Sequence, residues 1–587
     1  MTSSSAEDSA PGPWGSDAVA ETIRALGYRY IALVPGSSFR GLHDSLVNHL
    51  GNADPEMIVC LHEEHAVSIA DGFSRVAQEP MAVALHSNVG LMHATMTIFN
   101  AWCDRRPMLI IGATGPVDAA KRRPWIDWIH TSKDQGALVR HYVKWDDQPT
   151  SARAAVESVL RADQIARTAP AGPVYVCLES EMQETRAQGP VLVPDVSRFR
   201  PPEPAEASAA SLQRCLALLR EAHAPLLLFG RLSRDAGDWD RRVALAEALG
   251  ATVLTTVHNA SCFPTEHPLH PVAPVGERPV PAETDLLRRA DLILSFDWHD
   301  LGGFLSARLG SAQSQAPAPQ PVVHVSLDAT LANGWSMDHQ ALPAADLRLA
   351  VDPDRFVAQL LDAVRADRRV ASAPLVPAGD HWAKAAPLGP EPGAPFDAEQ
   401  VAFALSAFAR ERAVTFARLS FGWPRSACRF RSPLDFLGKD GGGAVGTGPG
   451  HTIGAAIALR DSGRLTVGVI GDGDYLMGVN ALWTAARMRL PLLFVIVNNR
   501  SYFNDEVHQE RMAVQRGRPV ANRWIGQRLD DPPPDLVGLA RAQGFEGEGP
   551  VSSVADLQAA LRRGAAVVAA GGRYVIDAHV LPGYSER

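Results

Sequence analysis

The sequence predicts an α/β protein made of three doubly wound domains, each built on a parallel sheet. Short apolar runs of strand length alternate with longer segments of helical periodicity through most of the 587 residues. Polar residues follow many of these runs, as is typical of the carboxyl edge of a parallel sheet, where ligands bind. Two segments rich in Pro, Gly, Glu and Ala, at 185–208 and 371–396, are typical of linkers. We therefore expect domains at residues 14–190, 209–370 and 397–582.

The composition describes an ordinary globular chain that is too long for a single core. Its net charge of −9 argues against nucleic acid as a partner. The six cysteines show neither paired nor metal-binding spacing, and the N-terminus lacks the basic and apolar regions of a signal peptide. Since no apolar run reaches membrane-spanning length, we expect a cytoplasmic protein with no membrane contact. Residues 1–13 are expected to be disordered.

In the first domain, chemically useful side chains follow three of the predicted strands. These strands are at 31–34, 57–61, 81–85, 108–111 and 174–178. Ser37 lies in PGSS after the first strand, Glu63 in HEEHA after the second, and His86 in LHS after the third. Each also has a structural interpretation: Glu63 as a charged helix start, Ser37 as a helix cap, and His86 as a ring bonded to backbone. The central domain, with strands at 225–229, 252–255, 292–295 and 322–325 and a loop at 311–321, carries no comparable motif.

The third domain contains the most specific pattern of the chain. An apolar strand at 465–470 leads into a tight turn, Gly471-Asp472-Gly473, then a helical stretch, then a strand at 492–497 that ends in Asn498-Asn499. A right-handed crossover would place Asp472 beside Asn499. Two oxygen ligands at strand ends suit a Mg²⁺ ion shared with a phosphate, which the following helix N-terminus would also attract. The alternative is that both motifs merely cap strands.

GDG followed after about two dozen residues by NN resembles the cofactor motif of the thiamine-diphosphate-dependent decarboxylase and acetohydroxyacid synthase family. ALWTAA at 481–486 and FVIVNN at 494–499 are most similar to its benzoylformate decarboxylase branch. The resemblance implies thiamine diphosphate and Mg²⁺ as cofactors, with the metal held by Asp472, Asn499 and Ser501. It implies further cofactor contacts at Gly471, Gly473, Asp474, Thr447 and Ser420.

The resemblance also implies the catalytic residues. Alignment on Ala70-Asp71-Gly72 makes Glu63 the carboxyl that hydrogen-bonds the cofactor's aminopyrimidine, a role that needs a raised pKa. His86 and Ser37 correspond to substrate-contacting positions, and a histidine can carry protons near neutral pH. Two residues depart from the family pattern: Thr447 stands where a bulky apolar residue usually supports the cofactor, and His93 replaces a common Asn.

The activity implied is decarboxylation of a 2-oxo acid through a C2 carbanion and an enamine, with carboligation to an aldehyde as a further outcome. The alternatives are an acetolactate-synthase-like carboligase, a 2-hydroxyacyl-CoA lyase, and, from another class, a non-catalytic cofactor-binding protein. The family binds its cofactor between subunits, so the resemblance implies a homodimer or homotetramer. His65, His299 and His451 are expected at surface or structural positions, and residues 122–130 line a substrate entrance or pack at an interface.

Overall fold

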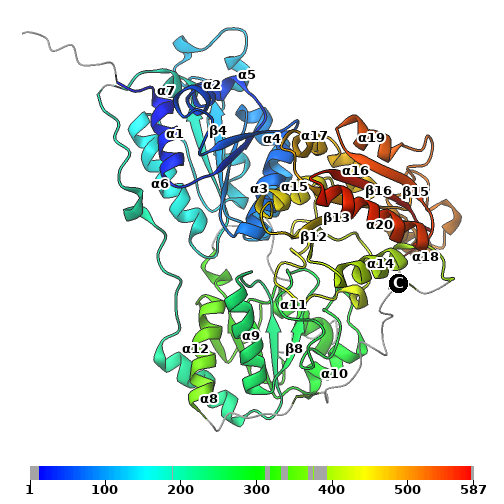
Figure 1. Ribbon diagram of the computed structural model, residues 1–587. Coiled ribbons are helices and arrows are strands. Elements are labelled where there is room, and N and C mark those ends of the chain that lie inside the picture. The colour runs from blue at the N-terminus through cyan, green and yellow to red at the C-terminus, as the bar shows by residue number, and fades with distance from the viewer. Residues whose placement is uncertain are drawn as a thin grey trace, which may run out of the picture. The chain divides into compact units, whose positions relative to one another are not determined.

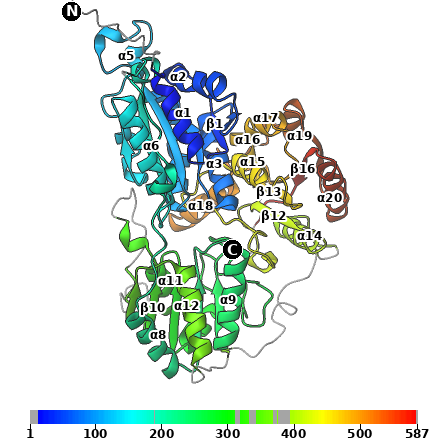
Figure 2. The same cartoon turned by 60° about the vertical axis from the view of Figure 1, so that its left-hand side comes forward.

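The computed structural model describes residues 12–187, 189–310, 318–331, 342–367, 374–375, 390 and 393–583. Within them the chain forms three parallel sheets, each accompanied by helices (Figures 1 and 2). The predicted fold class is therefore confirmed. The chain divides into two compact units: one holds the residues up to Asp71 together with Glu79–Pro202, and the other holds Gly72–Gln78 together with the residues from Glu203 onward. The domain limits given above stay a prediction.

The first sheet has six strands in the order β2-β1-β3-β4-β6-β5. Its strands are β1 (Tyr30–Leu33), β2 (Glu56–Val59), β3 (Met81–Ala84), β4 (Met108–Thr114), β5 (Asp146–Asp147) and β6 (Pro173–Glu179). Its helices are α1 (Gly15–Ala25), α2 (Arg40–Asp44), α3 (Glu63–Ala77), α4 (Ser87–Cys103), α5 (Asp127–His130), α6 (Ala152–Arg167) and α7 (Ser180–Glu184). Every residue of β3, β4 and β6 is buried, which explains why these strands appear as continuous apolar runs.

The central sheet has five strands in the order β11-β10-β9-β7-β8. Its strands are β7 (Pro225–Phe229), β8 (Thr252–Thr255), β9 (Leu292–Phe296), β10 (Val322–Val325) and β11 (Leu347–Leu349). Its helices are α8 (Ala209–Glu221), α9 (Ala236–Leu249), α10 (Pro281–Arg289), α11 (Leu301–Leu309) and α12 (Pro353–Ala366). The sequence predicted four of these strands and missed β11, which is short and alternates buried and exposed residues.

The third sheet runs in the order β12-β13-β14-β16-β15. Its strands are β12 (Val414–Arg418), β13 (Leu465–Gly471), β14 (Leu492–Asn498), β15 (Glu546–Val551) and β16 (Arg573–His579). Its helices are α14 (Ala398–Arg410), α15 (Gly448–Ala458), α16 (Asp472–Gly478), α17 (Ala481–Arg487), α18 (Phe503–Gln515), α19 (Leu536–Ala542) and α20 (Val554–Ala569). All pairs of strands in the three sheets are parallel.

The predicted turn at Gly471-Asp472-Gly473 is wrong. Gly471 is the last residue of β13, and Asp472 is already the first residue of α16. The strand thus passes directly into a helix, with Gly471 extended at φ −74° and ψ 161°. The helical stretch that follows is two short helices, α16 and α17, rather than one. This direct passage points the first amides of α16 toward the carboxyl edge of the sheet.

The predicted segments between domains are described only in part. In the described part of 185–208, the chain forms the short 3-10 helix Val196–Phe199 and a single bridge from Arg186 to Trp14, with irregular backbone elsewhere. Most of 371–396 and of 1–13, and the first part of the loop at 311–321, lie outside the described residues.

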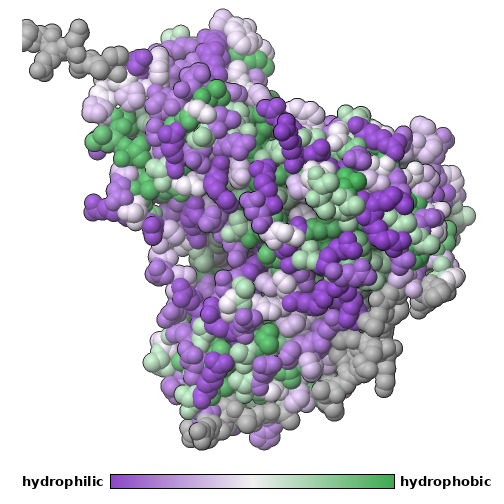
Figure 3. All heavy atoms as spheres, viewed as in Figure 1, coloured by the Kyte–Doolittle hydropathy of each residue, from purple (hydrophilic) through white to green (hydrophobic). Residues whose placement is uncertain are grey.

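Hydrophilic and hydrophobic residues are interspersed over the face drawn in Figure 3. Among the residues described, no helix combines the length and the apolar character needed to span a bilayer.

Candidate functional site

Asp472 and Asn499 are brought together by the pairing of their strands. Gly471 at the end of β13 pairs with Val497 of β14, so both chains leave the sheet at the same edge. The backbone amide of Ser501 donates to Asp472 Oδ2 at 3.1 Å and to Asn499 Oδ1 at 3.0 Å. Both oxygens therefore lie within hydrogen-bonding distance of a single nitrogen. The predicted juxtaposition of these two side chains is present.

The carboxylate of Asp472 is poorly solvated. Its residue is 4% exposed, and burial raises the pKa to about 6, while hydrogen bonds from the backbone amides of Gly473, Arg500 and Ser501 act in the opposite direction. A cation beside this carboxylate would stabilise its charged form. The side-chain donor atoms that converge here are oxygens, from this carboxylate and from the Asn499 amide. Hard oxygen ligands with positions left for water and phosphate fit Mg²⁺.

The loop that carries Ser501 is held by a buried acid that the sequence analysis missed. The Ser501 hydroxyl donates to Glu506 Oε1 at 2.5 Å, and Glu506 is 2% exposed on the first turn of α18. Gly473 is needed on the other side, since a Cβ there would lie 2.5 Å from the ring of Tyr502. These contacts fix the backbone on both sides of the two oxygen ligands.

Asp474 holds a neighbouring loop. Its Oδ1 accepts from the backbone amides of Gly446 at 2.7 Å and Gly448 at 3.2 Å. Gly448 begins α15, so Asp474 orients the approach to that helix. The predicted contact of Asp474 with a diphosphate stays a prediction, and these bonds show its carboxylate already engaged by the loop. Ser420 is buried two positions past the end of β12, and its carbonyl accepts from Trp423.

Thr447 lies in a polar network rather than in an apolar contact. It is fully buried, and its hydroxyl donates to Asp440 Oδ2 at 2.9 Å. Asp440 also pairs with Arg418, with Arg75 at 3.2 Å and with His451 Nδ1 at 3.1 Å. Because Asp440 lies in a glycine-rich loop without periodicity, no signal in the sequence pointed to it. His451, expected at a surface or structural position, is a buried member of this network.

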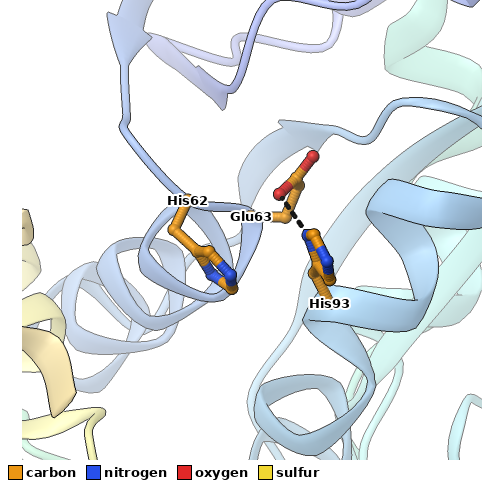
Figure 4. Close-up of side chains that lie close together, drawn as sticks. All are labelled: His62, Glu63 and His93. Carbon is orange, nitrogen blue, oxygen red and sulfur yellow. Dashed lines mark hydrogen bonds and ion pairs between the residues drawn. The ribbon is translucent and has the colours of Figure 1, made fainter.

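Glu63 is the first residue of α3 and is 8% exposed. Its Oε2 lies 3.1 Å from His93 Nδ1, and the rings of His62 and His93 stack with centroids 4.8 Å apart (Figure 4). Helix α4 approaches this closely because residue 90 is glycine: a Cβ there would lie 3.0 Å from Glu63 Oε1. The residue noted above as a departure, His93, thus contacts the predicted catalytic carboxyl directly.

His86 is positioned by Ser38, which the sequence analysis passed over in favour of Ser37. The Ser38 hydroxyl lies 2.9 Å from His86 Nδ1 and accepts from the backbone amide of Ser87 at 3.0 Å. Ser38 is buried, whereas Ser37 is half-buried. PGSS offers two adjacent serines, and only the backbone conformation decides which one meets the histidine. The role of Ser37 stays a prediction.

Burial lowers the pKa of four histidines in the first domain, which favours their neutral forms. Burial lowers the pKa of His65 to about 4. Burial also lowers the pKa of His62, helped by the charge of His93, and lowers the pKa of His130. The pKa of His86 is lowered by burial and then by the charge of His130, whose ring it meets edge-on with centroids 4.6 Å apart. Neutral imidazoles can both donate and accept protons near pH 7.

The structure also shows how exposed the side chains are at two other places singled out in the sequence, residues 122–130 and His65. Trp125 and Trp128 are 65% and 68% exposed, although the Arg123 guanidinium lies 5.4 Å from the centre of the Trp125 ring. Exposed tryptophans are compatible with both predictions for residues 122–130, a substrate entrance and an interface. His65, expected at a surface or structural position, is buried at 3% exposure next to the cluster that contains Glu63.

Three family models match the chain. The N-terminal TPP binding domain of thiamine pyrophosphate enzymes matches residues 13–139, the central domain matches 212–359, and the C-terminal TPP binding domain matches 420–578. Among curated proteins, benzoylformate decarboxylase of Pseudomonas aeruginosa is 26% identical over 517 residues, which cover 84% of this chain and 86% of that protein. A probable acetolactate synthase large subunit of Methanocaldococcus jannaschii is 22% identical over 565 residues, covering 91% and 87%.

Solved structures show the same fold. The thiamine diphosphate-dependent 4-hydroxybenzoylformate decarboxylase of Rhodococcus jostii RHA1 has a TM-score of 0.76 at 23% identity and covers 98% of this chain and 100% of its own. Benzoylformate decarboxylase of Polynucleobacter necessarius has a TM-score of 0.76 at 19% identity, with coverage of 97% and 99%.

The lowered pKa of His86 predicts a pH dependence of stability. An unfolded histidine titrates near pH 6.5, so the folded state binds fewer protons at this site than the unfolded state. The contribution to stability is therefore fully present above about pH 6.5 and is lost as the pH falls through the folded pKa. We expect His86→Asn to lose less unfolding free energy than the wild type between about pH 7.5 and about pH 5.

Denaturant unfolding at several pH values measures this difference. His141→Asn, which changes an exposed histidine in the same unit, serves as the matched control and should follow the wild type. If the unfolding free energy of His86→Asn fell as steeply with decreasing pH as that of the wild type, His86 would not have a lowered pKa in the folded protein.

Proposed function

Because this chain belongs to the thiamine pyrophosphate enzyme family, we propose that it is a Mg²⁺-dependent decarboxylase of an aromatic 2-oxo acid such as benzoylformate. Its cofactor is thiamine diphosphate, and Mg²⁺ is the usual metal partner of the family. The observation that carries the proposal is the buried Glu63 at the start of α3, among histidines that favour their neutral forms. Membership of an enzyme family disfavours the non-catalytic alternative.

In this proposal the third sheet holds the cofactor's diphosphate through the metal. Asp472 and Asn499 bind Mg²⁺ through side-chain oxygens and Ser501 through its backbone carbonyl, in keeping with their convergence on one amide. Gly473 leaves room at the start of α16 for a phosphate to approach the backbone, and helix N-termini attract phosphate. Gly471, Thr447 and Ser420 shape the same edge of the sheet.

The first domain supplies the acid–base groups. Bound cofactor supplies the carbon nucleophile and the electron sink. Glu63 bonds the aminopyrimidine ring and holds the proton shared with it, a role suited to a carboxyl that is 8% exposed. His86, held by Ser38, carries a proton to or from the substrate, and Ser37 begins the 3-10 helix Ser37–Phe39 that carries Ser38. The neutral form of His86 fits it to accept a proton near pH 7.

The substrate class and the assembly are also part of this proposal. The names of the relatives favour an aromatic 2-oxo acid, since one is called benzoylformate decarboxylase and a structural neighbour 4-hydroxybenzoylformate decarboxylase. A second candidate, carboligation of 2-oxo acids, rests on the acetolactate synthase relative. We propose a homodimer or homotetramer in the cytoplasm, with Glu63 and the metal ligands of one site coming from different copies.

The role of Glu63 is tested by Glu63→Gln. We expect the variant to retain binding of Mg²⁺ and thiamine diphosphate but to exchange the cofactor's C2 proton at least about 100-fold more slowly, the lower end of what acid–base catalysis contributes. Proton NMR after acid quenching of the exchange in deuterated water measures the rate. Glu64→Gln, which changes the next residue, is the matched control and should exchange like the wild type. Equal rates in both variants would refute the role of Glu63.

The metal assignment is tested by Asp472→Ala. Loss of a residue that only supports a ligand already costs about 10–100-fold in metal affinity, so loss of the ligand itself should weaken cofactor binding at least about 100-fold. Calorimetry with thiamine diphosphate in excess Mg²⁺ measures the affinity. Asp461→Ala, an exposed acid just before β13, is the control. Undiminished affinity in Asp472→Ala would exclude this residue as a ligand.

The substrate is tested with the wild-type protein. We expect CO₂ release from benzoylformate at a kcat/KM at least about tenfold above that for pyruvate, since an aromatic pocket discriminates by several contacts. Release of CO₂ is followed together with chromatography of the products. Formation of acetolactate from pyruvate as the main product would favour the carboligase instead, and cleavage of a 2-hydroxyacyl-CoA would favour the lyase.

A further inference from the structure

His62, Glu63 and His93 form a cluster of three groups able to bind a metal. Two imidazole nitrogens and one carboxylate oxygen all lie within 4.8 Å of one another (Figure 4). The shortest approach is 3.1 Å, between His93 Nδ1 and Glu63 Oε2. The three side chains converge because His62 immediately precedes α3 and Glu63 begins it, while His93 projects from α4, which Gly90 allows to come close.

The cluster combines a fixed carboxylate with an open approach. The Glu63 side chain is 10% exposed, whereas the His93 side chain is 57% exposed. An ion can therefore arrive from the solvent side, and His93 can rotate to complete the coordination. Neighbouring ligand atoms in a tetrahedral site with bonds of about 2.0–2.2 Å lie about 3.4 Å apart. The separation of 3.1 Å between His93 Nδ1 and Glu63 Oε2 is close to this value. The His62 and His93 rings are stacked, so they must turn for a nitrogen of each to face one ion.

The ligand set selects the class of metal. Two imidazoles and one carboxylate bind Zn²⁺ in open sites that keep a fourth position for water. The same set is unsuited to Mg²⁺, which prefers oxygen ligands and retains several waters. The cluster thus differs in chemistry from the oxygen-only set of Asp472, Asn499 and Ser501.

We propose that His62, Glu63 and His93 bind Zn²⁺ or a chemically similar divalent transition metal, and that this ion inhibits the enzyme. The inhibition rests on the proposed function of Glu63, because the ion occupies the carboxylate that must contact the cofactor's aminopyrimidine ring. Zinc binding and activation of the cofactor then compete for the same oxygens. The metal site itself does not depend on the proposed function, because it is inferred from the positions of the three side chains.

The experiment uses the full chain, freed of bound metals and supplied with excess Mg²⁺ so that oxygen-ligand sites are filled. Calorimetry with Zn²⁺ is compared for the wild type, His93→Asn and His62→Gln. The control is His49→Asn, which removes an exposed histidine that lies 2.9 Å from Glu21 in the same unit. We expect each of the two test variants to bind Zn²⁺ about tenfold more weakly or worse, and the control to bind it like the wild type.

X-ray absorption at the zinc edge gives a second readout. We expect two nitrogens at about 2.0–2.1 Å and a carboxylate oxygen at about 2.0–2.2 Å in the wild type, with one nitrogen fewer in His93→Asn. Zn²⁺ affinity unchanged by either His93→Asn or His62→Gln overturns the site. A spectrum that contains only oxygen ligands does the same.

Turnover assays separate the inhibitory role from the proposed function. We expect the Zn²⁺ concentration that halves turnover to rise about tenfold or more in His93→Asn, relative to that variant's own zinc-free rate. Zinc bound at the three residues without loss of turnover overturns the inhibition and leaves the proposed function intact. Normal C2 exchange in Glu63→Gln overturns the proposed function and the inhibition together, whereas the calorimetry still decides the metal site.

Discussion

The register between β13 and β14 is the constraint on which the cofactor edge of this protein depends. Five consecutive residue pairs, from Val467 opposite Leu493 to Gly471 opposite Val497, fix where the two chains leave the sheet. Every residue of β14 is buried, so a slip of one residue would turn its apolar side chains to the wrong face. Burial of apolar side chains along these two strands therefore determines that Asp472 and Asn499 lie close together.

Two buried carboxylates of the third domain, Asp440 and Asp472, have opposite surroundings. Asp440 is surrounded by Thr447, Arg418, Arg75 and His451, so its charge is fully compensated and serves structure. Asp472 accepts mainly from backbone amides, and its pKa is raised to about 6. An uncompensated buried carboxylate is costly unless a cation joins it. The two acids therefore differ in how far their charge is compensated, and this difference agrees with the proposed metal-binding role of Asp472.

The sequence was sufficient where burial and periodicity decide the outcome. The central strands β7, β8 and β10 have the limits expected from their apolar runs, and the α/β class follows from the same pattern. β5, β11 and β15 were missed because they are short or half-exposed edge strands, whose residues lack a continuous apolar signal. β12 and β16 were not predicted either, although they are largely buried. The passage from β13 into α16 was misjudged because Gly-Asp-Gly is typical of turns, and only the tertiary context makes it a helix start.

The candidate site was predictable in its residue types and less so in its contacts. Glu63 and Asp472 are recognisable from motifs. In contrast, Ser38 and Asp440 contact residues far away in the sequence, and Glu506 contacts a loop residue five positions before it. Ser38 meets His86 across 48 positions, and Glu506 reaches Ser501 from a new helix. Such pairings carry no local period, because they depend on which loop the sheet edge brings alongside.

The surroundings of Glu63 make its two predicted ligands mutually exclusive. Burial favours the neutral forms of His62 and His86, and a neutral imidazole is both a proton carrier and a metal ligand. Replacing the family's common Asn with His93 adds a second imidazole nitrogen at the one carboxylate that catalysis needs to keep accessible. The same oxygen cannot bond an aminopyrimidine nitrogen and complete a zinc site at once. On the proposed roles, a histidine at position 93 would therefore subject Glu63 to competition from transition metals, and its exposed ring would set how readily that competition occurs.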